Sequence, residues 1–304
     1  MLQLKFKQPD SAPLTLTYSL DHLSALTEIE QTGKILFYDF GLYEIDKSRM
    51  KVDRMAYPEA ELIVVHKKRD TRKQRRCLVT ANIVSWQGSK PLNDPESSAK
   101  PSYCRLVLHY LEWLAAVEEL ATLDEKRRLK LTTKHMIATI LLTISFNTFK
   151  YGSVHLLLCN GFFFPQKRKQ TTDRYRNEIE VIVNELERNV VNRLRELKVC
   201  EEEYVLLKLV LLFSHSESLG EKHTETTRRL HGKYDQILLH YVKHSQGNCS
   251  VEELIDRISS LFELLTSLNS ISEMAELCLV HIVALDIAGM RGKLTFDLHL
   301  RQHQ

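Results

Sequence analysis

Cys159 and His155 are the side chains in this sequence whose types and spacing best fit nucleophilic chemistry. A histidine base close to a cysteine can activate the thiol for attack on a carbonyl carbon. No third group stands at a spacing that would orient the imidazole, and many inert segments carry such a pair on one face. The loop signatures of phosphate sites, dinucleotide sites, zinc peptidases and serine hydrolases are absent from the sequence. We therefore expect no catalytic residue, no cofactor-binding residue and no enzyme activity.

The cysteines and histidines also give no metal-site pattern. The six cysteines, at positions 77, 104, 159, 200, 249 and 278, lack metal-ligand spacing such as C-x-x-C. We expect no metal site, and we expect reduced thiols that pack as small apolar side chains. Among the thirteen histidines, His135, His281 and His299 are interpreted as surface residues or as core residues with satisfied hydrogen bonds.

The composition indicates one large domain or two small ones, because the chain has 304 residues of which 43% are apolar. A net charge of +3 is too small to indicate a nucleic-acid partner. Residues 66–76 carry seven Lys or Arg side chains, which fit a nuclear-import or nucleic-acid patch or, as we prefer, a solvated loop. The start lacks an apolar signal core, and residues 136–146 are too few to span a bilayer. We expect an intracellular protein without membrane contact.

Hydrophobic periodicity predicts the elements that position these residues. A last long helix is expected to end before Gly289, and a short hairpin is expected at Asn160-Gly161. Residues 44–102 hold prolines, a basic run and a Ser/Asp/Pro cluster, and they predict a long irregular insertion with one short strand at 62–65. The other expected helices cover residues 20–30, 103–120, 124–149, 171–197, 200–213 and 221–242.

Residues 199–214 form the most informative segment. An acidic cluster opens an apolar helix in which Glu203 and Lys208 are the charged pair, and acidic groups suit the amide end of a helix dipole. A helix that is apolar on nearly every side is buried. This predicts a helical sandwich with this helix in its central layer. A desolvated Glu203 would then need a charged partner.

The pattern E-x-x-x-L-K, at Glu203, Leu207 and Lys208, resembles the eighth helix of nuclear hormone receptor ligand-binding domains. The order of the other segments is similar to that family, and the first expected helix resembles its nematode members. The resemblance implies an all-α fold, namely a three-layer antiparallel helical sandwich with one small β-hairpin. It covers residues 18–300, with tails at 1–17 and 301–304.

The resemblance also implies an ion pair and a ligand pocket. Arg257 is the partner that it nominates for Glu203. We expect no cofactor, and a lipophilic molecule is the ligand that the resemblance implies. The pocket residues that we assign on this basis are Tyr110, Leu114, Ile144 and Phe162.

A coregulator groove is a further implication of the resemblance, with Lys130, Lys134 and Asp297 as its candidate residues here. In the family, a lysine clamps one end of the coregulator helix. Either Glu112 or Ala115 stands at that position in this sequence, according to the alignment, and neither is basic. We therefore expect a weakened clamp.

A heptad-like apolar stripe runs along the last long helix. This spacing fits a core-facing row, and it equally fits a seam between two subunits. The family forms its dimers through its tenth and eleventh helices, so the resemblance favours the seam. Its residues are Leu264, Leu268, Ile271, Ala275, Cys278, Ile282 and Leu285.

Together these features predict the ligand-binding and dimerisation domain of a nuclear-receptor-like transcription regulator in the nucleus, with the cytoplasm as a second compartment. The expected partners are receptor-like domains, in homo- or heterodimers, and coregulator peptides. The family's zinc DNA-binding module needs C-x-x-C pairs that this sequence lacks, so we expect no direct DNA binding. The alternative is a helical protein-interaction scaffold that takes no ligand.

Overall fold

The computed structural model describes residues 3–6, 14–17, 85–92, 95–114, 117–165, 174–214, 225–245, 250–290, 295 and 298–299. This part of the chain is mostly helical, as the sequence predicts. The expected helix at 20–30, the strand at 62–65 and the basic run at 66–76 lie outside the described residues.

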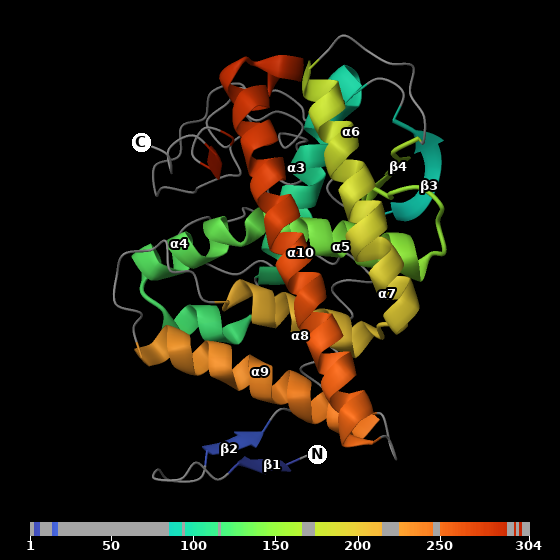
Figure 1. Cartoon of the computed structure of the whole chain (residues 1–304). Helices are drawn as coiled ribbons and strands as arrows, with labels where there is room; N and C mark the ends of the chain where they lie inside the picture. Colours follow the sequence, from blue (N-terminus) through green and yellow to red (C-terminus); the bar gives the residue numbers. More distant parts are fainter. Residues whose placement is uncertain are drawn as a thin grey trace.

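The described chain runs from two short N-terminal strands through a series of helices to a long final helix (Figure 1). The expected tail at 1–17 contains β1 and β2, which pair antiparallel. The strands are β1 (Gln3–Phe6), β2 (Leu14–Thr17), β3 (Ser85–Pro91) and β4 (Asn160–Phe163). The helices are α3 (Pro95–Leu114), η1 (Glu118–Thr122), α4 (Glu125–Lys134), α5 (Met136–Lys150), α6 (Arg174–Leu186), η2 (Glu187–Val191), α7 (Asn192–Leu197), α8 (Glu201–Leu212), α9 (Glu225–Ser245), α10 (Val251–Ala284) and η4 (Ile287–Gly289).

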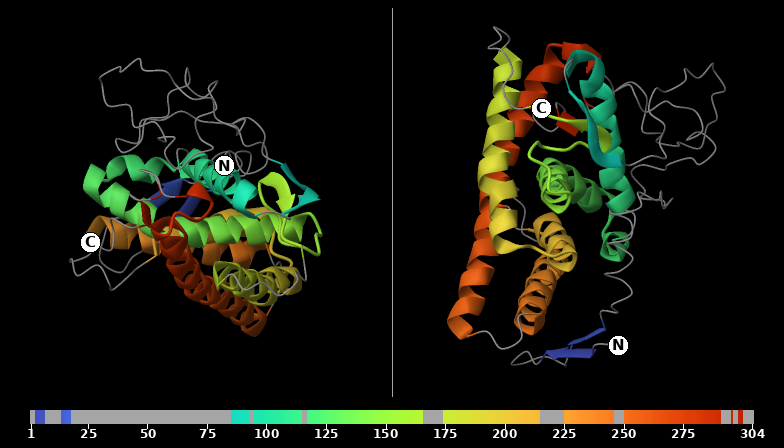
Figure 2. Two further views of the ribbon diagram at one scale, coloured as in Figure 1. Left: turned by 90° about the horizontal axis from the view of Figure 1, so that it is seen from above. Right: turned by 90° about the vertical axis from the view of Figure 1, so that its right-hand side faces the viewer.

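The α8 helix is the buried element that the sequence predicts. Cys200 and Glu203 form a capping box at its start, and every residue from Glu203 to Leu212 is buried. α8 packs against α5 and α9, while α5 also packs against α3 and α10. In Figure 2, α5 lies between the α6 and α10 pair on one side and α3 on the other. These pairings show how the helices cover one another, and the antiparallel three-layer sandwich itself stays a prediction.

The predicted hairpin turn forms at Asn160-Gly161, but the strand partner of β4 is different from the expected one. Leu158 N donates to Phe162 O over 2.8 Å, and Gly161 has a positive φ of 84° that suits glycine. The arm before the turn contributes one isolated bridge, Leu157 to Phe163. The longer pairing is parallel and joins β4 to β3.

The structure corrects the expectation that residues 44–102 are irregular throughout. Residues 85–91 form β3, and α3 begins at Pro95, well before the expected start at Tyr103. Proline is tolerated at the first position of a helix, where no backbone donor is needed. Pro95 therefore marks a helix start, and Pro101 lies inside the same helix, in a segment that sequence reasoning interpreted as a loop.

Two expected helices are interrupted. The helix expected over 124–149 is divided at His135, whose φ of −96° and ψ of 6° separate α4 from α5. The helix expected over 171–197 contains the π turn η2 between α6 and α7. Single π turns inside α-helices often accompany functional sites, because they shift the side chains that follow. Here the turn follows Leu186 directly.

Candidate functional site: an apolar cavity with a polar cluster at one end

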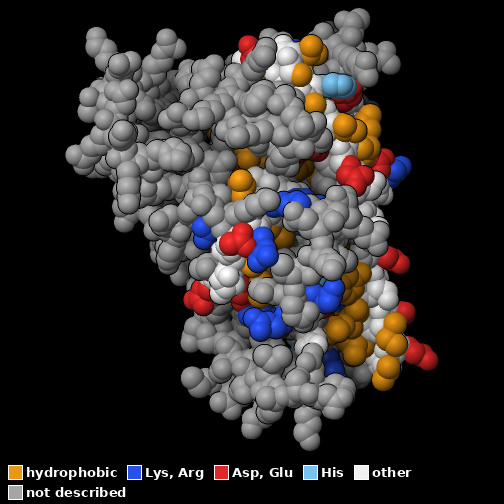
Figure 3. Space-filling view, turned by 90° about the vertical axis from the view of Figure 1, so that its left-hand side faces the viewer, with side chains coloured by type: hydrophobic (Ala, Val, Ile, Leu, Met, Phe, Trp, Pro, Cys, Tyr) orange, Lys and Arg blue, Asp and Glu red, His pale blue; other side chains and the backbone are white. Residues whose placement is uncertain are grey.

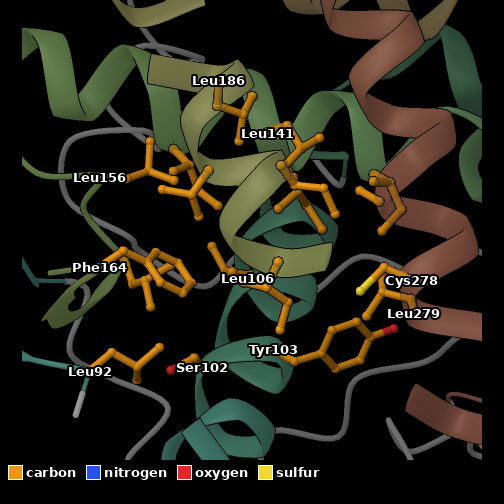
Figure 4. A pocket seen from close by; sticks show the side chains of 18 of the residues that line it. Leu92, Ser102, Tyr103, Leu106, Leu141, Leu156, Phe164, Leu186, Cys278 and Leu279 are labelled. Atoms are coloured by element: carbon orange, nitrogen blue, oxygen red, sulfur yellow. The ribbon is translucent and has the colours of Figure 1, made fainter. Parts of the chain in front are cut away.

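An apolar cavity with a volume of about 210 Å³ lies among α3, α5, α6, α10 and the β4 turn (Figure 4). Each helix contributes residues three and four positions apart, so that each presents one face to the same space. Its lining residues are Leu92, Ser102, Tyr103, Leu106, Ile137, Ile140, Leu141, Ile144, Leu156, Leu158, Phe164, Arg176, Ile179, Ile182, Val183, Leu186, Ala275, Cys278, Leu279, Ile282 and Met290.

The structure places one of the four expected pocket residues at this cavity. Ile144 lines it, whereas Tyr110, Leu114 and Phe162 are absent from the lining set. The Tyr110 hydroxyl donates to Thr132 O over 2.7 Å, and burial raises the pKa of this phenol well above its usual value. The earlier turns of α3, which carry Ser102, face the cavity. Ser102 lies before the expected start of this helix, whereas Tyr103 and Leu106 lie inside the expected helix and were not assigned to the pocket.

The cavity lining contains few polar groups. Ser102 Oγ lies 2.8 Å from Asn160 Nδ2, which donates to it. Arg176 is the charged side chain of the lining set. Burial and the neighbouring Glu178 raise the pKa of the Cys278 thiol to about 12, so it stays protonated and weakly nucleophilic near neutral pH. These groups can orient a ligand, and the rest of the wall offers only apolar contact.

A polar cluster joins one end of the cavity to the C-terminal residues. The Tyr103 hydroxyl lies 2.6 Å from His299 Nε2, and His299 Nδ1 lies 2.7 Å from Glu276 Oε1. Tyr103 is on α3, Glu276 is on α10, and the His299 side chain is fully buried. His299 is therefore a core histidine with both ring nitrogens satisfied, which is one of the two interpretations that the sequence allowed.

The structure brings Glu203 and Arg257 together. Arg257 Nε lies 2.9 Å from Glu203 Oε1, and Nη2 lies 2.7 Å from Oε2, so the contact is bidentate. Arg257 Nη1 also donates to Leu197 O over 2.9 Å. The Glu203 side chain is 1% exposed and that of Arg257 is 17% exposed. The pair thereby ties the start of α8 to α10 and to the end of α7.

Lys208 is, with Glu203, the second charged residue of α8 that is buried. Its Nζ lies 4.0 Å from the centre of the Trp113 ring and 5.5 Å from that of Tyr204. A cation over an aromatic face is attracted by the negative charge of that face. This contact connects α8 to α3.

A family model described as the ligand-binding domain of nuclear hormone receptor matches residues 91–279, which is more than half of the 304 residues. The chain belongs to this family. Ligand-binding domains of nuclear hormone receptors are generally not enzymes, and the family in general forms receptor dimers and binds coregulators. The matched range runs from the end of β3 into α10 and holds most of the residues that line the cavity. The nematode subtype stays a prediction.

Two further observations on this nuclear receptor domain concern the pair Cys159 and His155 and the question of a membrane-spanning helix. Cys159 is fully buried, and the ring of His155 stacks on Phe163 with 4.9 Å between ring centres. Among the helices that the structure describes, none has both the length and the hydropathy needed to cross a bilayer.

The expected dimer seam is wrong for six of its seven residues in this nuclear receptor domain. They are between 0% and 8% exposed and form part of the domain's own core, so they are not available to a partner. Ala275, Cys278 and Ile282 line the cavity, and only Leu285 is well exposed, at 72%. The apolar periodicity indicates a buried face. It does not show what covers that face, because a helix that packs in the domain's own core has the same spacing as one at a dimer seam. The large apolar side chains that α10 does expose are Val251, Ile255, Met274 and Leu277, and the exposed Leu285 follows directly after its last residue.

The expected coregulator groove is described in part. Lys130 and Lys134 lie on α4 and are half-buried. Partial burial, and then the charge of Lys130, lower the pKa of the Lys134 ammonium. Figure 3 views the side of the molecule on which α4 lies, where basic and acidic side chains are mixed. Asp297, Ala115 and the side chain of Glu112 lie outside the described residues.

Proposed function

We propose that this chain is the ligand-binding domain of a nuclear-receptor-like transcription regulator, and that the cavity holds a small lipophilic molecule. The observation that carries this proposal is an almost wholly apolar cavity inside a chain of this family. Its volume of about 210 Å³ exceeds the ~150 Å³ of an apolar cavity that takes up benzene. It is smaller than the roughly 300–1,000 Å³ of drug-sized ligand sites. The ligand is therefore compact.

The proposal includes partners and a compartment. Family membership supports a nuclear protein that pairs with receptor-like domains and binds coregulator peptides. Because the expected seam is buried, the face proposed for dimerisation is the outer side of α10, with Met274 and Leu277 as its apolar contacts. Lys130 and Lys134 stay the proposed basic residues of the coregulator groove, with Asp297 as the acid. We propose no enzyme activity and no direct contact with DNA.

A cavity-filling variant tests ligand binding. Native mass spectrometry and solvent extraction of protein purified from cells should show a co-purifying small molecule. Leu141→Trp, on the cavity wall, should remove it, whereas Val181→Trp, at a position of α6 that is 52% exposed, should retain it. Naphthalene, a compact apolar probe, should bind the wild type in calorimetry and fail to bind Leu141→Trp.

The opposite result would favour the scaffold. If no molecule co-purifies, and naphthalene binds neither the wild type nor Val181→Trp, the cavity does not serve a ligand. A helical interaction scaffold would then be the better description of the chain.

A further inference from the structure

Two histidine side chains lie next to each other in the last turns of α9. His240 and His244 have ring centres 4.0 Å apart, with an angle of 50° between the ring planes. Residues four positions apart lie on the same face of a helix, one above the other. His240 is half-buried and His244 is exposed, so the pair is open to solvent on one side. This face of α9 therefore presents two imidazoles together.

The distance between the two rings is close to that of two ligands on one metal ion. An imidazole nitrogen binds Zn²⁺ at about 2.0–2.1 Å, so two rings that bind one tetrahedral ion have their centres about 5 Å apart. A small rotation of the exposed His244 side chain covers the difference from the observed 4.0 Å and leaves the backbone in place. The same spacing on one helix supplies two zinc ligands in a class of zinc peptidases.

The electrostatic surroundings of the pair suit a cation. His244 lies in the last turn of α9, where the backbone carbonyls carry partial negative charge. The Tyr241 hydroxyl lies 3.4 Å from the Cys200 thiol, so the acidic first turn of α8 is beside this end of α9, and the charge of Glu202 acts on Tyr241. Lys243 opposes a cation, but its side chain is exposed, and solvent and salt screen its charge.

The pair is a site with two protein ligands. Among the residues that the structure describes, no group of three or more His, Cys, Asp and Glu side chains could hold a metal ion. Water must therefore fill the other coordination positions. Imidazole suits Zn²⁺, Cu²⁺ and Ni²⁺, whereas Mg²⁺ and Ca²⁺ need oxygen ligands. The expectation of no metal site rested on the spacing of the cysteines, which a histidine pair on one helix does not involve.

We propose that His240 and His244 bind one divalent transition-metal ion of the class that prefers imidazole. The bound ion holds the last turns of α9 in helical form, because both ligands bind it together only while their helical spacing is kept. These turns contact the start of the buried helix α8 through Tyr241 and Cys200, so the ion stabilises that junction. Neither histidine lines the apolar cavity, and the site is therefore independent of the proposed lipophilic ligand.

Calorimetric titration of the metal-free full chain with NiCl₂ tests the site, because imidazole suits Ni²⁺ while thiolates select softer ions. His240→Asn and His244→Asn should each weaken Ni²⁺ binding by at least about tenfold, since each removes one of two protein ligands. His231→Asn is the matched control, because His231 lies elsewhere on α9 with its Nδ1 2.9 Å from Asp235 Oδ2. It should bind Ni²⁺ as the wild type does. Wild-type affinity in His244→Asn would overturn the proposal, and so would an equal loss in His231→Asn or no binding by the wild type.

Hydrogen exchange measured by mass spectrometry tests the effect of the ion on α9. With Ni²⁺ at about ten times its Kd, exchange of the amides at 241–245 should slow by about tenfold, because local opening must first release the ion. The same slowing is expected in His231→Asn, and none is expected in His244→Asn or with MgCl₂ in place of NiCl₂. Unchanged exchange at 241–245 in the wild type would overturn the stabilising role of the ion. Slowing that persists in His244→Asn would place the ion elsewhere and overturn the site.

Discussion

Two carboxylate clusters of this domain differ in what surrounds them, and the Glu203 side chain is 1% exposed whereas that of Glu276 is 29% exposed. Glu203 meets Arg257 at the start of α8, where every residue from Glu203 to Leu212 is buried. Glu276 meets His299 at one end of the cavity, and the cluster continues to the cavity-lining Tyr103. In the packed region, a broken contact leaves a charge that cannot reach water. Beside the cavity, a side chain has space to move into. We expect the Glu203 cluster to contribute mainly to the free energy of unfolding of the whole domain. We expect the Glu276 cluster to affect mainly the local opening of the residues around His299.

Arg257→Met is expected to have the largest effect, because it leaves the Glu203 carboxylate buried without its partner. We expect a loss of about 3–5 kcal/mol in the free energy of unfolding, measured by urea denaturation at neutral pH. Arg193→Met is the matched control, since Arg193 is 36% exposed beside Glu196 and should change stability by less than about 1 kcal/mol. If the two substitutions lower the free energy of unfolding equally, the buried ion pair is no more important for stability than the ion pair at the surface.

Core truncations compare the two regions directly. Leu207→Ala, at a fully buried position of α8, should lower the free energy of unfolding by about 3–5 kcal/mol. Leu141→Ala, on the cavity wall, should lower it by about 2 kcal/mol, because a side chain beside empty space has fewer packing partners to lose. Thermal and urea unfolding of both variants measure the difference. A larger loss for Leu141→Ala would show that the cavity is filled and packed in solution.

His135 adds a buried titratable group in another part of the domain. Burial, and then the charge of Lys134, lower the pKa of this imidazole from 6.5 to about 3. The unfolded chain takes up the proton near pH 6.5, whereas the folded chain resists it, so this contribution to stability is complete above pH 6.5. It is lost as the pH falls toward 3, by about 1.4 kcal/mol per pH unit.

The measurement for His135 is urea unfolding between neutral and acidic pH. His135→Asn should flatten the dependence in this window, because it removes the titrating group. His281→Asn, at an exposed site, should retain the slope of the wild type. A slope that is the same in His135→Asn and the wild type would place the acid sensitivity elsewhere.

Tyr103→Phe is expected to have the smallest global effect. It removes one hydrogen bond to His299, which lowers the free energy of unfolding by about 0.5–1.5 kcal/mol at most. Arg257→Met should lower the free energy of unfolding of the whole domain, whereas Tyr103→Phe should act mainly on hydrogen exchange of the amides at 295–299. A global loss as large as that of Arg257→Met would mean that the cavity end is as tightly packed as α8.

Local patterns in the sequence were enough to predict several elements. The apolar run of α8, interrupted only by Lys208, predicts burial on nearly every side, whatever covers it, and the structure shows that burial. The Asn160-Gly161 turn follows from the backbone freedom of glycine, and Gly161 has the positive φ that the turn needs. The mainly helical class follows from apolar residues that recur at helical spacing. These features depend on neighbours within a few residues.

The tertiary structure decided what lies opposite each apolar face. The stripe on α10 was correctly identified as apolar, but its spacing is the same whether a subunit or the domain's own core covers it. β4 pairs with β3, from a segment whose prolines indicated a loop. Tyr103 and His299 are separated by 196 positions in the sequence. No local pattern joins residues so far apart, because contacts of this kind form only when α3, α10 and the end of the chain pack together.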